Sequence, residues 1–333
     1  MLKQPYLLFV GDAHDKLAAK SAVGVLQWRP ELCVGQVRLD GCRADLDLPV
    51  MSVEEGATTG ARTLIIGVAN AGGTIPGHWV ETFAGALRAG LDLANGLHDR
   101  LRDIPDLVAL AAANGCHLHD VRHPARTFDV GTGEPRSGRR LLTVGTDCSV
   151  GKMYATLALE REMRVRGIAA VFRATGQTGI FVAGAGVAVD AVVADFISGA
   201  VEWLAPAAAE DHWDLIEGQG SLFHPSFAGV SLGLLHGAQA EALVMCHEPV
   251  RTHMRGLPNR PLPDVAACIE ANLAAARLTS PAVRCVGVAV NTSEMQQAGE
   301  GEGYLARLER ELGLPCADPL KSDVAAIVDR LLD

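Results

Sequence analysis

Aromatic residues are scarce in this chain of 333 residues: they make up only 5% of it, although 49% of the residues are hydrophobic. The chain is instead rich in alanine and valine, and it contains 36 glycines. Small side chains let helices pack closely on a sheet, and this composition is typical of α/β proteins with parallel strands. The length is too great for one ordinary domain and suits two, each able to bury a core.

The chain also lacks the patterns of a metal protein, a nucleic-acid binder and a membrane protein. Its eight cysteines include no Cys-x-x-Cys pair and no zinc-like cluster with histidine, so we expect reduced thiols and no metal. The net charge of −10 argues against nucleic acid or an anionic membrane as the main partner. The N-terminus lacks a hydrophobic signal core, and no apolar run approaches the ~20 residues that span a bilayer. We therefore expect a cytoplasmic protein with small-molecule partners.

Apolar runs alternate with helix-like segments along the chain, which predicts parallel sheets. The first part is expected to form a Rossmann-like N-terminal domain, residues 1–122. Residues 123–140 are expected to form a linker, because this segment is rich in arginine, glycine and proline and poor in apolar residues. The second domain is then 141–333, and it is predicted to contain a helix near 183–195.

The motif with the clearest chemistry follows the apolar run 140–144. A glycine-rich loop between a strand and a helix, closed by a lysine, binds phosphate through backbone N–H groups, the lysine and the helix N-terminus. We therefore expect the second domain to have a P-loop NTPase-like fold with a mostly parallel sheet. The residues expected to form this anion site are Gly145, Thr146, Asp147, Cys148, Ser149, Val150, Gly151, Lys152 and Met153.

The residue after the P-loop lysine departs from the usual motif. A serine or threonine hydroxyl normally stands there and holds Mg²⁺, a hard cation that prefers oxygen ligands. The thioether of Met153 is a soft, weak acceptor. We therefore expect this loop to bind a phosphorylated molecule without placing magnesium in the usual way.

Polar residues also follow three other apolar runs of the second domain, at positions where open α/β sheets bind ligands. Arg173 and Thr175 stand on a glycine-containing loop and are candidates for binding phosphate or carboxylate. Glu217 lies at the end of an apolar run, where a carboxylate is costly unless it meets a cation or a substrate proton. Asn291 offers a donor and an acceptor, which suits a purine edge, although an asparagine that caps a strand-end turn fits nearly as well.

Two further pairs of residues are open to a functional and a structural interpretation. Arg251 and Arg255 can bind an acidic ligand, or they can belong to a solvated basic loop. His224 and His236 lie within twenty residues of Glu217, and either can act as a general base with a near-neutral pKa or fill a structural role.

The P-loop resembles that of dethiobiotin synthetase and its relatives, which reads GTDT-x-VGKT. Thr175–Gly179, Glu217–Gly220 and Asn291 resemble its second loop, its EGAGG segment and its purine-binding asparagine, in matching order. Ser149 and Met153 replace two groups near its metal, which puts a kinase-like or ligase activity in doubt. With the Rossmann-like front domain and the signature Asp-Cys-Ser-Val-Gly-Lys-Met, the whole chain is similar to the D-glutamate N-acetyltransferase family.

That resemblance implies acetyl transfer from acetyl-CoA to the amino group of D-glutamate, within D-glutamate catabolism. The P-loop and Asn291 would hold the adenosine phosphates of CoA. Glu217 is then the first candidate base, with His224 and His236 behind it, and the substrate carboxylates would need arginines or backbone donors. The alternatives are an ATP- and Mg-dependent ligase or kinase of the synthetase type, and a nucleotide-binding regulatory protein. A homodimer or higher homo-oligomer is expected by analogy.

Overall fold

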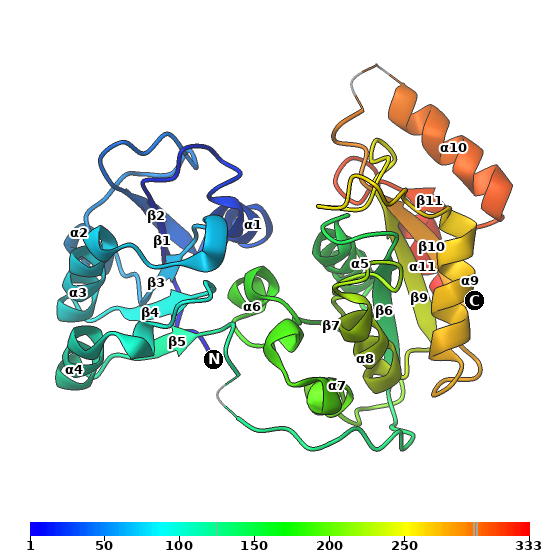
Figure 1. Ribbon diagram of the computed structural model, residues 1–333, viewed down its shortest axis with the longest axis horizontal. Helices are drawn as coiled ribbons and strands as arrows, with labels where there is room; N and C mark the ends of the chain where they lie inside the picture. Colours follow the sequence, from blue (N-terminus) through cyan, green and yellow to red (C-terminus); the bar gives the residue numbers. More distant parts are fainter. Residues whose placement is uncertain (125, 296, 298) are drawn as a thin grey trace. The chain divides into compact units, whose positions relative to one another are not determined.

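The computed structural model describes residues 1–124, 126–295, 297 and 299–333. By its internal contacts the chain divides into two compact units: Met1–Ala125 with Gly176–Ala191, and Arg126–Thr175 with Val192–Asp333. Each unit is an α/β structure built on a parallel sheet (Figure 1), so the predicted fold class is confirmed. The division expected from the sequence, 1–122, 123–140 and 141–333, did not foresee that Gly176–Ala191 groups with the first unit.

The first unit contains a five-stranded parallel sheet with the strand order β2-β1-β3-β4-β5. Its strands are β1 (Tyr6–Gly11), β2 (Cys33–Arg38), β3 (Thr63–Ile66), β4 (Asp92–Asn95) and β5 (Leu118–Asp120). Every residue of β1, β3 and β4 is buried, as expected for strands that helices cover on both faces.

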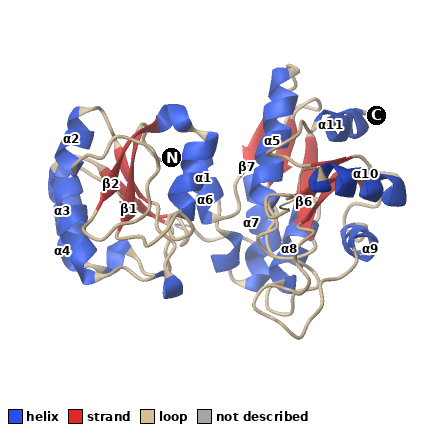
Figure 2. Ribbon diagram, turned by 90° about the horizontal axis from the view of Figure 1, so that it is seen from above, coloured by secondary structure: helices blue, strands red, loops and turns tan. Residues whose placement is uncertain are grey.

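The helices of the first unit cover both faces of its sheet. They are α1 (Lys20–Trp28), α2 (Val53–Thr58), α3 (Val80–Arg88), α4 (Pro105–Asn114) and α6 (Gln177–Ala183). Helices α2, α3 and α4 lie on one face, and α1 and α6 lie together on the other (Figure 2). Local signals fix their ends: Ser52 and Glu55 form a capping box at α2, and α4 begins at a proline and ends at the left-handed Gly115.

The second unit contains a six-stranded parallel sheet with the strand order β11-β10-β9-β6-β8-β7. Its strands are β6 (Arg139–Gly145), β7 (Ala170–Arg173), β8 (Trp213–Ile216), β9 (Ala242–His247), β10 (Arg284–Val290) and β11 (Cys316–Ala317). The central strand β6 is followed by the P-loop, and its neighbours β8 and β9 end beside that loop.

Helices also cover both faces of the second sheet. They are α5 (Lys152–Val165), α7 (Ile197–Leu204), α8 (Ala228–Ala238), α9 (Val265–Ala276), α10 (Glu300–Leu312) and α11 (Ala325–Leu332). Helices α5 and α11 share one face, whereas α8 and α9 pack on the other (Figure 2). Within the ranges that the structure describes, no helix has the length and apolar character needed to cross a membrane.

The helix predicted near 183–195 was wrong. Helix α6 ends at Ala183, because Gly184 adopts a left-handed conformation with φ +75°. The segment that follows forms only two short 3₁₀ turns, Val189–Ala191 and Ala194–Phe196.

Candidate functional site

The P-loop, residues 145–153, has the predicted order of strand, loop and helix. It leaves the buried end of β6 at Gly145 and enters α5 at Lys152. Ser149 and Gly151 both have positive φ, +54° and +96°. A Cβ atom at Gly145 would lie 3.0 Å from Lys152 Nζ, so only glycine leaves room for the ammonium there. The backbone is therefore wound around the lysine, as the phosphate-binding interpretation requires.

The ammonium of Lys152 is buried inside this loop. Its Nζ donates a hydrogen bond to the carbonyl oxygen of Asp147 over 2.8 Å. Burial lowers the pKa of Lys152, whereas nearby acidic groups, among them Asp147 and Glu217, act in the opposite direction. A phosphate oxygen would offer this ammonium a negative charge in place of a neutral carbonyl.

Asp147 ties the P-loop to the segment that follows β9. Its carboxylate is fully buried and accepts hydrogen bonds from Cys148 N (2.7 Å), Arg251 Nη1 (2.8 Å) and Arg255 N (2.7 Å). The Arg251 guanidinium also donates to Cys148 O over 2.7 Å and pairs with Glu248. Arg251, expected from the sequence to bind substrate, thus has protein partners that brace the loop, while the Arg255 side chain remains exposed.

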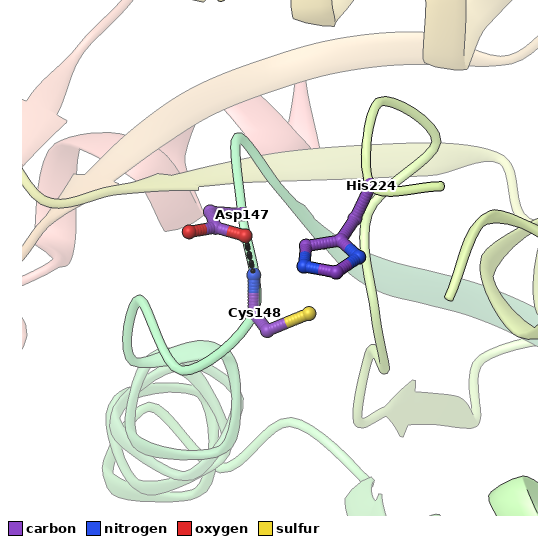
Figure 3. A group of neighbouring side chains, drawn as sticks. All are labelled: Asp147, Cys148 and His224. Carbon is purple, nitrogen blue, oxygen red and sulfur yellow. Dashed lines mark hydrogen bonds between the residues drawn. The ribbon is translucent and has the colours of Figure 1, made fainter. Parts of the chain in front are cut away.

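Asp147, Cys148 and His224 lie together at this point (Figure 3), with their potential ligand atoms within 4.8 Å of one another. His224 is buried, and its Nε2 lies 3.1 Å from Arg255 O while its Nδ1 lies 3.2 Å from Ser226 N. Burial raises the pKa of the Cys148 thiol, although Lys152 acts against this. Arg255 and Arg251 add to the effect of Lys152, so three cationic side chains lie near this thiol.

The same hydrogen bonds limit the ability of His224 to act as a base. Both of its ring nitrogens are engaged with the backbone, so one of these bonds would have to open before the ring could accept a substrate proton.

Glu217 follows β8 and lies beside the P-loop. Its carboxylate is 4% exposed and accepts hydrogen bonds from Thr175 N (3.0 Å) and Gln219 Nε2 (3.2 Å). Thr175 Oγ1 in turn donates to Glu217 O over 2.6 Å. The structure therefore brings Thr175 and Glu217 together, next to Lys152, whose pKa the Glu217 charge helps to raise.

Asn291 follows β10 and lies close to the P-loop, as the purine-binding interpretation needs. Its Cβ is 4.0 Å from the position that a Cβ at Gly151 would take. Its Oδ1 accepts a hydrogen bond from Ser293 N over 3.1 Å, as an asparagine that caps a strand-end turn does. Its backbone N–H donates to His247 O over 2.8 Å, which ties the two strand ends together.

His247 also lies at this edge of the sheet, at the end of β9. Its Nδ1 lies 3.2 Å from Thr146 Oγ1, and its ring stacks on Tyr304 with centroids 6.0 Å apart. Burial, with the charge of Arg251 adding to it, lowers the pKa of His247 to about 4.

The side chains of two predicted site residues do not join this group. Arg173 forms an ion pair with the buried Asp214, with Nε and Oδ1 2.7 Å apart, so it has a partner within the sheet. His236 lies in the last turn of α8, which ends beside Arg136, just before β6 begins. Because the P-loop follows the other end of β6, about 20 Å away at ~3.3 Å per residue, the structure does not support His236 as a base at that site.

Comparison with known proteins gives matches over the whole chain. Residues 129–328 match a family model described as a domain of unknown function, DUF1611_C, P-loop domain, and residues 37–124 match DUF1611_N, Rossmann-like domain. Two curated proteins named D-glutamate N-acetyltransferase, from Tritonibacter scottomollicae and a Pseudoalteromonas species, are each 51% identical and cover 99% of both chains. A crystal structure of a DUF1611 family protein from Anabaena variabilis is 33% identical, covers 99% of both chains and gives a TM-score of 0.87.

Proposed function

The chain belongs to the DUF1611 family, whose curated relatives include D-glutamate N-acetyltransferases, and on that premise we propose that it transfers the acetyl group of acetyl-CoA to the amino group of D-glutamate. In this proposal the P-loop anchors the phosphates of CoA, and Asn291 binds the adenine edge. The protein is then an acyltransferase of D-amino acid catabolism that needs no ATP.

The observation that carries the proposal is a P-loop built for phosphate but lacking the usual hydroxyl for magnesium. Met153 stands where that hydroxyl is expected, at the start of α5. The nearby hydroxyls of Thr143 and Thr156 are 2.9 Å apart and bonded to each other, and Thr156 also donates to Lys152 O. A CoA diphosphate needs only the backbone donors, the helix N-terminus and Lys152.

The reaction places further demands on the protein. The acceptor ammonium must lose a proton before its nitrogen can attack the thioester carbonyl, and the oxyanion that forms needs hydrogen-bond donors. Glu217, the base expected from the sequence, lies beside Lys152. In acetyl-CoA the whole pantetheine arm separates the thioester from the phosphates. Glu217 lies at the site assigned to the phosphates, so it is better placed to interact with Lys152 than to deprotonate the reacting amine.

A thermal-shift comparison of CoA, acetyl-CoA and Mg-ATP tests this proposal. A ligand that binds the native state raises the unfolding midpoint in proportion to the logarithm of its concentration over Kd. We expect CoA and acetyl-CoA to stabilise the protein without magnesium, and Mg-ATP to do so less. Stabilisation by Mg-ATP alone would favour the ligase or kinase alternative and overturn the proposal.

A further inference from the structure

CoA carries a phosphate that ATP lacks, on the 3′ oxygen of its ribose. In the proposed function the P-loop and Lys152 hold the diphosphate of CoA, and Asn291 binds the adenine edge. The ribose is bonded directly to the adenine, so its 3′-phosphate is expected on the Asn291 side of the P-loop. This phosphate lies outside the diphosphate chain and needs a cation of its own.

Lys321 lies beside Asn291, at the same edge of the second sheet. Strand β11 pairs in parallel with β10, so Asn291 and the turn that carries Lys321 leave the sheet at the same edge. The Lys321 Nζ donates a hydrogen bond to the carbonyl oxygen of Thr292, the residue after Asn291, over 2.9 Å. Asn291 in turn approaches the P-loop, with its Cβ 4.0 Å from the position that a Cβ at Gly151 would take. The P-loop, Asn291 and the Lys321 ammonium therefore follow one another along this edge.

A buried carboxylate fixes the turn without pairing with the lysine. Asp318 is 3% exposed, and its Oδ1 accepts a hydrogen bond from Leu320 N over 2.9 Å. Its Oδ2 accepts from Thr292 N over 3.0 Å and from Thr292 Oγ1 over 2.5 Å. The main-chain N–H of Lys321 donates to Asp318 O over 3.2 Å. Both carboxylate oxygens are thus used by other groups, and Lys321 forms no ion pair among the described residues.

The Lys321 ammonium is able to bind an anion. It has three N–H donors, and a main-chain carbonyl takes one of them. The residue is exposed, so the other two donors are open to a ligand. Other cations that follow strands at this edge are placed differently. Arg173 and Arg251 each pair with a buried aspartate, and the main chain of Arg255 is bonded to the first half of the P-loop.

We propose that Lys321 binds the 3′-phosphate of CoA and is the residue by which this site distinguishes CoA from 3′-dephospho-CoA. The inference rests on the proposed acetyl transfer from acetyl-CoA. A phosphate monoester carries nearly two negative charges at pH 7, so its bond to an ammonium is stronger than the bond that a neutral carbonyl makes. The residues that would contact CoA, namely Lys152, Asn291 and Lys321, all belong to the second unit.

The test compares the Kd values of CoA and 3′-dephospho-CoA, measured by isothermal titration calorimetry without magnesium. We expect the wild type to bind CoA more tightly by about tenfold or more, because dephospho-CoA cannot make the charged hydrogen bond. Lys321→Ala should bind both ligands with the Kd that the wild type has for dephospho-CoA. Lys321→Arg keeps the charge and the donors, and it should retain a preference for CoA.

The matched control is Arg255→Ala, which removes another exposed cation near the P-loop. If the Arg255 side chain contacts the diphosphate, its loss weakens both ligands by the same factor, so the ratio of the two Kd values should stay as in the wild type. Turnover gives a second readout. Lys321→Ala should raise the KM for acetyl-CoA and leave kcat unchanged, because the 3′-phosphate contact is the same in the ground state and the transition state.

Two failures can be told apart. The role of Lys321 is refuted, and the proposed function stands, if the wild type binds CoA no better than dephospho-CoA. The same conclusion follows if Lys321→Ala keeps the wild-type preference or weakens both ligands equally, or if Arg255→Ala abolishes the preference. If the wild-type protein binds neither ligand, the proposed function fails, and this inference fails with it.

Discussion

At the residue scale, the methionine after the P-loop lysine distinguishes this loop from that of a magnesium-dependent nucleotidase. Met153 follows Lys152 in the first turn of α5, and its sulfur cannot replace a hydroxyl as a ligand of a hard cation. By the sequence resemblance to dethiobiotin synthetase, Ser149 also takes the place of an acidic residue near the metal. A hydroxyl at position 153 alone therefore does not restore both groups that support magnesium binding.

We predict that Met153→Thr creates no ATPase activity. The variant should release no ADP with Mg-ATP and should form N-acetyl-D-glutamate as the wild type does, which chromatography of both products can measure. ADP release by this variant would instead show that a single hydroxyl was all that the loop lacked for ATP chemistry.

Lys152 should supply much of the affinity for CoA. A hydrogen bond to a charged group contributes about 1.5–3 kcal/mol, so Lys152→Ala should weaken CoA binding roughly tenfold to a hundredfold. Isothermal titration calorimetry measures this change directly. The control is Lys16→Ala, which removes an exposed lysine that pairs with Asp47 in the first unit and should leave Kd unchanged. An unaltered Kd for Lys152→Ala would place the CoA phosphates elsewhere.

His247 should make the protein less stable in mild acid. Its pKa is about 4 in the folded state, against an ordinary value of 6.5, because it is buried. As the pH falls from 6.5 to 4, the unfolded chain takes up a proton that the folded protein does not, so the free energy of unfolding decreases, by on the order of 3 kcal/mol. Above pH 6.5 this contribution is fully present.

Urea unfolding at neutral pH and at pH 5 measures this decrease. His247→Asn keeps an acceptor for Thr146 but cannot titrate, so the variant should lose less stability between the two conditions than the wild type. Equal losses in the two proteins would assign the acid sensitivity to other groups.

The sequence predicted those residues of the P-loop site whose place follows from their position at the end of a strand. Lys152, Glu217 and Asn291 each follow a different strand, and the carboxyl ends of parallel strands meet at one edge of a sheet. The roles of Arg173 and Arg251 were not predictable in this way, because a sequence shows a charge but not its partner across the fold.

At the scale of elements, glycines let helices α7 and α8 pack closely. A Cβ at Gly237 would lie 2.4 Å from Ser198 O, and one at Gly233 would lie 2.5 Å from Ile197 Cγ2. Backbone and side chains of α7 therefore occupy the space that larger residues of α8 would need. The small residues that dominate the composition are the physical basis of this contact.

Two alanine substitutions on α8 should therefore have opposite effects. Gly237→Ala should lower the unfolding midpoint, because the new methyl group overlaps the backbone of α7, and overpacking costs about 1–3 kcal/mol. Gly229→Ala, on the same helix, meets no atom within 4 Å. It should be neutral or raise stability by about 0.5–1 kcal/mol through helix propensity. Thermal unfolding measures the midpoint of both variants. A similar change of the midpoint in both would contradict the close packing of α7 on α8.

The alternation of strands and helices was predictable, because buried parallel strands appear as short apolar runs. The course of the chain after β7 was not. The apolar residues after Gly184 resemble part of a helix, yet tertiary packing folds them otherwise, and Gly176–Ala191 groups with the first unit. Such an excursion leaves no periodic signal in the sequence.

At the scale of the whole molecule, the chain combines a Rossmann-like domain with a P-loop domain, as the two family models describe. The homo-oligomeric state and the cytoplasmic location expected from the sequence stay predictions.

The most direct test of the proposed acetyl transfer is product formation by the purified protein. Purified protein is incubated with D-glutamate and acetyl-CoA, without ATP or magnesium, and N-acetyl-D-glutamate and free CoA thiol are measured. We predict that the two products appear in equal amounts. Acetyl transfer from acetyl-CoA is contradicted if no N-acetyl-D-glutamate forms, or if this product forms only with Mg-ATP and is accompanied by ADP.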